Sequence, residues 1–107
     1  MVASYEYLSI LRPKHGDFIA TMTMEEKRVM ERHFAYTKRL FEQGKIILGG
    51  AATDGAIGIL VLRVESEEEA HEIFDNDPAV KAGIGYPELH PFRIGLFSCS
   101  QEGAAST

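Results

Sequence analysis

Cysteine is nearly absent from the sequence: Cys99 is the single one among 107 residues. One cysteine excludes an internal disulfide and any metal site built from several thiolates. The polar stretch around Cys99 is a poor setting for a catalytic thiol. The sequence also lacks the ~20 consecutive apolar residues that a membrane span requires, and no signal-peptide pattern opens it. We therefore expect a cytoplasmic protein without a membrane partner.

Positive charge is scarce as well. The chain has 11 lysine and arginine residues against 16 aspartate and glutamate residues, which gives a formal net charge of −5. Because nucleic-acid binding needs a positive surface, we expect no nucleic-acid partner. The sequence contains no HxH, HExxH or clustered-cysteine pattern for a metal, and no GxGxxG or P-loop for a nucleotide. We therefore expect neither a metal nor an organic cofactor.

The composition is that of an ordinary globular protein, with 45% hydrophobic and 25% charged residues. A chain of this length forms one domain that buries roughly two-thirds of its unfolded surface. We expect this single domain over residues 1–97. The polar stretch SCSQEGAAST at 98–107 is expected to form a flexible C-terminal tail.

The longest predicted element is a helix over 23–44. Thr23 and Glu26 form a capping-box pattern at its start, and Gly44 is suited to its C-terminal end. At about 100° per residue, one side of the helix collects the apolar residues Val29, Met30, Phe34, Tyr36, Leu40 and Phe41. His33 lies within this apolar side, and Thr37 follows it by one turn. A polar ring in that position is either a core histidine with a satisfied hydrogen bond or a functional group.

Asp77 also has two interpretations. Before Pro78 it is a good N-cap for a short helical turn that ends at Gly83. Alternatively, its carboxylate accepts the ring N–H of His33 and orients that ring for acid–base chemistry. The two roles are compatible because a carboxylate has two oxygens. The sequence separation by itself does not establish contact.

Strands are predicted at 4–11, 45–51, 56–64 and 89–97, and a second helix follows the capping box of Ser66 and Glu69. The element order is therefore βαββαβ. This order predicts an α+β, ferredoxin-like fold with a four-stranded antiparallel sheet and two main helices on one face.

The outer face of this sheet is predicted to expose Tyr5, Tyr7 and alternate residues of 57–64. An apolar face of that kind usually marks association, so we expect a homodimer formed through the sheet face. The connection at 12–22 is long and carries Arg12, Lys14 and His15. It is either a simple connection or a loop that helps to bind an anionic or electron-rich ligand.

Two segments carry a resemblance to a known family. RHFAYTKRLFEQGKIILGGAATDG and ESEEEAHEIFDNDPAVKAGIGYPELHPFRIG resemble the YCII (YciI-like) family over roughly residues 5–97, and the DPAVKAG block is the most specific part. The resemblance implies a dimeric α/β-barrel type of ferredoxin-like fold. It also implies a shared site formed by His33 and Asp77, and action on small, often aromatic or lactone-like molecules without a bound metal. The residues after the strand glycines depart from the family pattern.

We therefore expect a small cofactor-free enzyme that acts on a small organic molecule by proton abstraction, elimination or isomerisation. His33 and Asp77 are the expected catalytic pair. Thr37, Gly49, Gly50, Arg12 and Lys14 are the expected substrate-binding residues. Two alternatives stay open: a non-catalytic ligand-binding or accessory domain, and a structural dimer in which His33 is a satisfied core residue.

Overall fold

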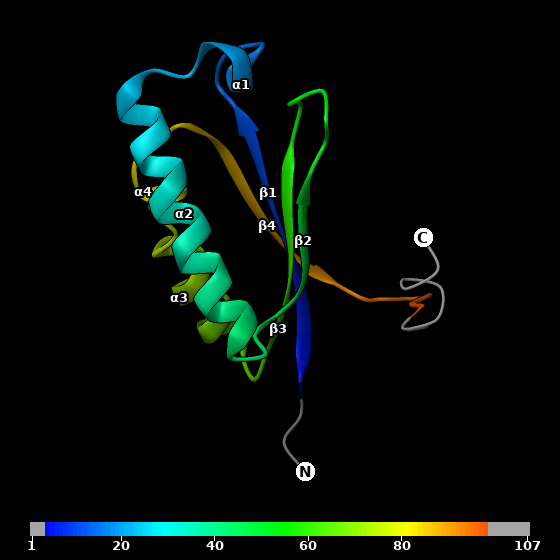
Figure 1. Ribbon diagram of the computed structural model, residues 1–107. Helices are drawn as coiled ribbons and strands as arrows, with labels where there is room; N and C mark the ends of the chain where they lie inside the picture. Colours follow the sequence, from blue (N-terminus) through cyan, green and yellow to red (C-terminus); the bar gives the residue numbers. More distant parts are fainter. Residues whose placement is uncertain (1–3, 99–107) are drawn as a thin grey trace.

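The computed structural model describes residues 4–98, so Cys99 and nearly all of the predicted tail at 98–107 lie outside the described residues. Figure 1 shows a curved sheet with helices on one side. Its elements, in chain order, are β1 (Tyr5–Pro13), α1 (Phe18–Thr21), α2 (Met24–Glu42), β2 (Ile46–Ala51), β3 (Gly58–Val64), α3 (Glu67–Asp75), α4 (Pro78–Lys81) and β4 (Gly85–Phe92).

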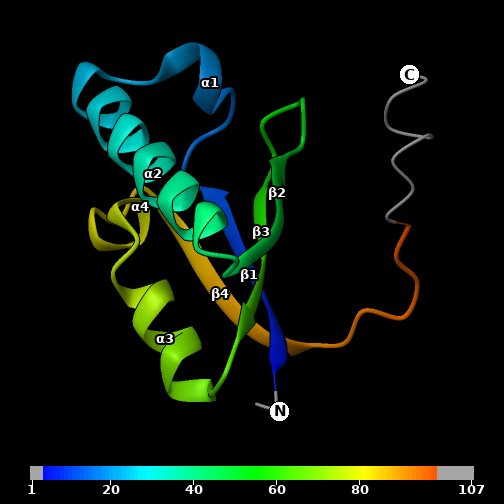
Figure 2. The same ribbon diagram turned by 60° about the horizontal axis from the view of Figure 1, so that its bottom comes forward.

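The sheet is antiparallel, and its strands lie in the order β2-β3-β1-β4. Helices α2, α3 and α4 cover the same face of it (Figure 2). This arrangement confirms the predicted ferredoxin-like fold. Strand β4 lies at one edge, where Pro87 and Pro91 are tolerated because an edge strand leaves one side of its ladder unpaired.

The sequence patterns at both ends of α2 and at the start of α4 are confirmed. Thr23 accepts the backbone N–H of Glu26, and the Glu26 carboxylate accepts the backbone N–H of Thr23. Gly44 adopts a positive φ of 78° just after α2, a conformation that glycine reaches without steric cost. Asp77 caps α4 by accepting the backbone N–H of Ala79. At the start of α3 only half of the predicted capping box forms, because Ser66 accepts the backbone N–H of Glu69 while the Glu69 carboxylate accepts that of Glu65.

Three expectations about the strands and the first connection are wrong. The last strand runs over Gly85–Phe92 rather than 89–97. Tyr7 does not lie on the outer face, because it is 8% exposed and packs in the core beneath the helices. The connection after β1 is shorter than expected and contains the helical turn α1, whose Phe18 is buried. The outer face instead carries Leu8 and Ile10, which pair with Val61 and Ile59 on β3.

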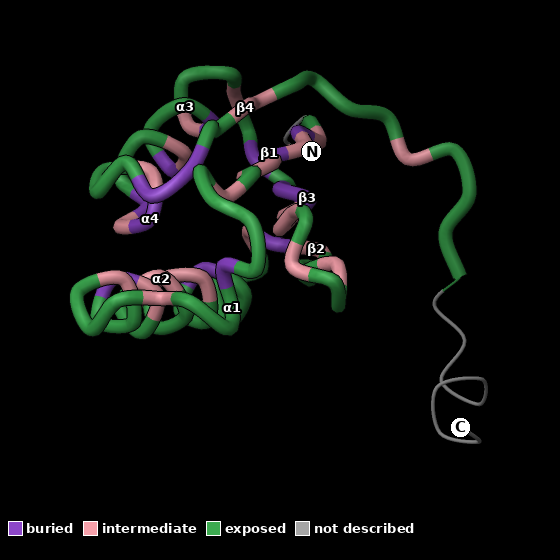
Figure 3. The backbone as a smooth tube through the Cα atoms, turned by 90° about the horizontal axis from the view of Figure 1, so that it is seen from above, coloured by how far each residue is buried: buried purple, intermediate pink, exposed green. Residues whose placement is uncertain are grey.

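The buried residues form two clusters between the helices and the sheet. The larger one, here called the main core, consists of Tyr7, Leu40, Ile46, Leu62, Val64, Ala70 and Ile73. The smaller one, the α1–α4 cluster, consists of Phe18, Val29, Ala79 and Ile84. Helix α2 buries only Val29 and Leu40 of its 19 residues, and in Figure 3 it is mostly intermediate or exposed. The helix therefore stands partly away from the sheet between the two clusters.

Candidate functional site

A pocket of about 740 Å³ lies between α2, α4 and the inner face of the sheet. Its lining includes Ile46 from the main core and Phe18 and Ile84 from the α1–α4 cluster, so the pocket occupies the space between the two. Most of the other lining residues are apolar or glycine, among them Leu11, Met22, Met30, Leu60 and Val80. The pocket is therefore suited to a molecule with a largely apolar body.

His33 and Asp77 meet within this apolar pocket. His33 Nδ1 lies 2.7 Å from Asp77 Oδ1, and the two side chains are 15% and 6% exposed. The same carboxylate oxygen accepts the backbone N–H of Ala79 at 2.9 Å. Asp77 thus caps α4 and contacts His33 at once, as the sequence allowed.

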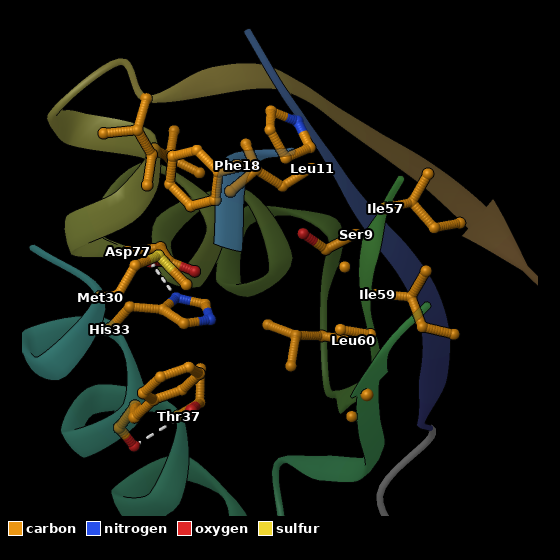
Figure 4. Close-up of a pocket in the computed structure, with 18 of the residues that line it drawn as sticks. Ser9, Leu11, Phe18, Met30, His33, Thr37, Ile57, Ile59, Leu60 and Asp77 are labelled. Atoms are coloured by element: carbon orange, nitrogen blue, oxygen red, sulfur yellow. Dashed lines mark hydrogen bonds and ion pairs between the residues drawn. The ribbon is translucent and has the colours of Figure 1, made fainter. Parts of the chain in front are cut away.

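The contact determines which nitrogen of His33 faces the pocket. An ionised carboxylate only accepts hydrogen bonds, so Nδ1 must carry the hydrogen in this pair. In the neutral ring, Nε2 then keeps its lone pair. Figure 4 shows this second nitrogen turned toward the pocket interior, and no hydrogen bond among residues 4–98 uses it. The free nitrogen is available to accept or return a proton.

One contact beside His33 lies within α2, and another joins α2 to α3. The Phe34 ring meets the His33 ring edge-on, with centroids 5.4 Å apart. The Tyr36 hydroxyl donates to the backbone carbonyl of Ile73 at 2.8 Å and ties α2 to α3. Burial raises the pKa of Tyr36, and the nearby charge of Asp77 raises it further. Tyr36 therefore stays a neutral hydrogen-bond donor that fixes the register of α2.

The structure brings together some of the expected substrate-binding residues and not others. Thr37, Gly49 and Gly50 line the pocket. Arg12 and Lys14 do not belong to its lining: Arg12 pairs with Glu88 on β4, and Lys14 Nζ lies 5.8 Å from the centre of the Tyr86 ring. His15 of the same connection contacts Glu26 at the start of α2. All three residues of this connection therefore make contacts at the protein surface, outside the pocket lining.

Sequence reasoning missed two polar residues of the pocket, Ser9 and Lys38. Lys38 is not among the residues that the helical periodicity places on the apolar side of the long helix, yet among the described lining residues it is the only lysine or arginine. Ser9 could not be assigned to the pocket from the sequence, because β1 carries apolar residues on both faces and its inner face could not be identified. Phe34 and Phe41 also differ from expectation, because they line the pocket while remaining 60% and 58% exposed.

Residues 4–98 contain neither a metal-binding cluster nor a membrane-spanning helix. No group of three or more histidine, cysteine, aspartate or glutamate side chains is placed to hold a metal ion. No helix in the same range is long and apolar enough to cross a membrane. The absence of a cofactor and the cytoplasmic location stay predictions.

The fold and the pocket define a class of protein: a small ferredoxin-like domain with a histidine–aspartate pair in an apolar cavity between one long helix and the sheet. Residues 6–90 match the family model of the YCII-related domain, and the chain belongs to that family. The family resemblance seen in the sequence is confirmed. A comparison with proteins of curated function finds no match.

One solved structure with the same fold is 5-chloro-2-hydroxyhydroquinone dehydrochlorinase (TftG) from Burkholderia phenoliruptrix AC1100, in complex with 2,5-dihydroxybenzoquinone. The similarity has a TM-score of 0.62 and 23% sequence identity, and it covers 83% of this chain and 95% of that one. At this identity, the likeness shows a shared fold.

Proposed function

We propose that the protein is a cofactor-free enzyme that uses His33 and Asp77 for acid–base chemistry on a small organic molecule. The observation that carries this proposal is the His33–Asp77 contact inside an apolar pocket, with Nε2 of His33 facing the cavity. A histidine with a purely structural role in the core is expected to have partners for both nitrogens, from the protein or from ordered water. Here one nitrogen is held and the other is free.

The proposed reaction begins with proton transfer to His33 Nε2 from a carbon or hydroxyl that a nearby carbonyl has made acidic; in a hydroxylated aromatic ring, this is the carbonyl of its keto tautomer, in which the chlorine is on a tetrahedral carbon. The electrons of the broken bond then form a new double bond, and either a leaving group departs or the proton returns at another position. The first outcome is an elimination and the second an isomerisation. Asp77 stabilises the positive charge that His33 carries in between. A positioned base of this kind contributes roughly 10²- to 10⁴-fold in rate.

The substrate proposal rests on the pocket walls and on the solved relative. Because the lining is mostly apolar, it favours a small ring, and Thr37, Gly49 and Gly50 are proposed to contact that ring. The TftG structure contains a dihydroxylated quinone, and its name describes removal of chloride from a hydroxylated ring. A chlorinated hydroxyhydroquinone is therefore the first compound to test.

The test measures chloride release from 5-chloro-2-hydroxyhydroquinone with an ion-selective electrode. We expect turnover by the wild type and a loss of roughly 10²-fold or more in His33→Ala. His71→Ala is a matched control, since His71 is an exposed histidine on α3 that pairs with Glu67. Equal rates in His33→Ala and the wild type would contradict the proposal. Binding of 2,5-dihydroxybenzoquinone with no turnover would instead support the ligand-binding or accessory domain.

We further propose that two copies associate through the outer sheet face. On that face Leu8, Ile10 and Ile59 are partly exposed beside the buried Val61. Light scattering at micromolar concentration is expected to give twice the 11.9 kDa mass of one chain. Ile10→Glu should shift the mass to that of one chain, because the charge would have to be buried. A wild-type mass of 11.9 kDa would contradict this association.

A further inference from the structure

Ser9 occupies the centre of the sheet beneath the pocket. It lies midway along β1, between Leu60 on β3 and Leu89 on β4. Only 9% of the residue is exposed. Its neighbours on the same strand face, Tyr7 and Leu11, are a core residue and a partly buried apolar residue. Ser9 is thus a nearly buried polar residue in apolar surroundings.

The hydroxyl of Ser9 is directed into the pocket. Ser9 belongs to the pocket lining, and Figure 4 shows its oxygen pointing from the sheet toward the side where His33 lies. Among the hydrogen bonds formed by residues 4–98, none involves this oxygen, whereas the buried Asp77 makes two. Every side-chain nitrogen or oxygen that is fully enclosed in this range has a partner. The Ser9 oxygen is therefore left open toward the cavity.

The packing of the sheet does not use the Ser9 hydroxyl. Because no group among residues 4–98 bonds to its oxygen, only water or a ligand in the cavity can be its partner. Alanine would fit the same central strand position without a group that needs such a partner. The serine is consequently better explained by a ligand in the pocket than by the packing of the sheet.

We propose that Ser9 is a substrate-binding residue that hydrogen-bonds an oxygen substituent of the ring on which His33 acts. This inference rests on the proposed function. His33 approaches the pocket from α2, while Ser9 approaches it from the sheet, and apolar side chains such as Met30 and Leu60 line the space as well. The matching substrate class is a small, flat ring with oxygen substituents on two sides. One oxygen or its neighbouring carbon reacts at His33, and the other bonds to Ser9.

The experiment compares two probes that differ by one hydroxyl, phenol and hydroquinone. Their dissociation constants are measured by NMR titration of the wild type, Ser9→Ala and Ser4→Ala. Ser4 is an exposed serine just before β1 and is the matched control. We expect the wild type to bind hydroquinone roughly 3- to 10-fold more tightly than phenol, the net effect of one hydrogen bond. Ser9→Ala should abolish this preference and leave phenol binding unchanged, and Ser4→Ala should retain it.

Each other outcome has a distinct meaning. If Ser9→Ala keeps the full preference for hydroquinone, the assignment of Ser9 is overturned while the proposed function stands. If Ser9→Ala weakens both probes equally, Ser9 only shapes the pocket and the assignment is again overturned. If neither probe binds the wild type, the assignment falls together with the proposed ring substrate. Chloride release in the His33 experiment reports on the function independently of these titrations.

Discussion

The helix–sheet interface has a close-packed part and a hollow part, although the same elements build both. The main core is called the closed end here, and the pocket is called the hollow end; the α1–α4 cluster borders the pocket on its other side. On β3, Leu62 is completely buried in the main core, while Leu60, two residues earlier on the same face, lines the pocket. On α2, Leu40 is buried, whereas Phe34 is 60% exposed at the pocket. The buried or partly buried polar residues Ser9, His33 and Asp77 all lie at the hollow end, where they line the pocket.

This difference shows how a domain of 107 residues keeps a large cavity. The close-packed end supplies apolar burial, and the hydrophobic contribution scales with the area removed from water. The hollow end lacks contacts across the cavity and contains a histidine and a carboxylate that must be held in place. Stability and site geometry therefore depend on largely different residues.

The largest expected effect comes from breaking the closed end. Leu62→Ala should lower the free energy of unfolding by about 2–5 kcal/mol, because it leaves a cavity among packed side chains. Leu60→Ala is the matched change at the hollow end, and it should cost clearly less because Leu60 already borders open space. Urea unfolding of both variants measures the difference. Equal losses would mean that the pocket wall is packed as tightly as the core.

The next effect separates the two roles of Asp77. Asparagine caps a helix about as well as aspartate, so Asp77→Asn should change stability little while chloride release falls, since the charge opposite His33 is lost. Asp77→Ala should lose activity as well and cost about 1 kcal/mol of stability through the missing cap. Thermal unfolding and the chloride assay together decide this. If Asp77→Asn matches the wild type in both, Asp77 is a cap and nothing more.

The smallest effect concerns an ion pair at the closed end, between Lys45 and Glu69. The backbone N–H of Glu65 and then the Lys45 ammonium hold the pKa of Glu69 below its ordinary value. A carboxyl with a lowered pKa in the folded state contributes stability above the ordinary glutamate pKa, and this contribution disappears as the pH falls through the folded value.

Glu69→Gln should therefore lower stability at pH 7 by less than about 1 kcal/mol, because the pair is partly exposed to solvent. The difference from the wild type should vanish under acid conditions. Urea unfolding at neutral and acid pH tests both statements. If the stability difference between the wild type and Glu69→Gln grew on acidification, Glu69 would not stabilise the fold through a lowered pKa.

The sequence predicted the elements whose signals are local. The capping box at Thr23 and the Asp77–Pro78 start of α4 both follow from residues within three positions of each other, and both are present. The outer and inner faces of β1 could not be distinguished, because apolar residues occur at both parities of the strand. Tyr7 was consequently placed on the wrong face. The boundary of β4 was missed because Pro87 and Pro91 weaken the strand signal, and only the edge position makes them acceptable.

The site residues that could be predicted are also those with a local signal in the sequence. His33 stood out because a polar residue interrupts an apolar helical stripe. Asp77 stood out because it precedes Pro78, and the family resemblance implied that the two residues share a site. Ser9 and Lys38 carry no such local signal. Their place in the pocket depends on how far α2 stands from the sheet, which is set by the packing at both of its ends. Arg12 and Lys14 were chosen for their charge, but Arg12 found a partner on β4 and Lys14 a neighbouring ring there.

A single carboxylate oxygen joins the orientation of His33 to the first turn of α4. Asp77 Oδ1 accepts both the ring N–H of His33 and the backbone N–H of Ala79. When this four-residue helix opens locally, the Ala79 amide becomes free to exchange its hydrogen with solvent. The same event removes one of the two hydrogen bonds that hold the Asp77 carboxylate beside His33. The hydrogen-exchange rate of the Ala79 amide therefore reports how often the first turn of α4 opens next to the His33–Asp77 pair. A bound ligand that holds His33 in place should lower this exchange rate.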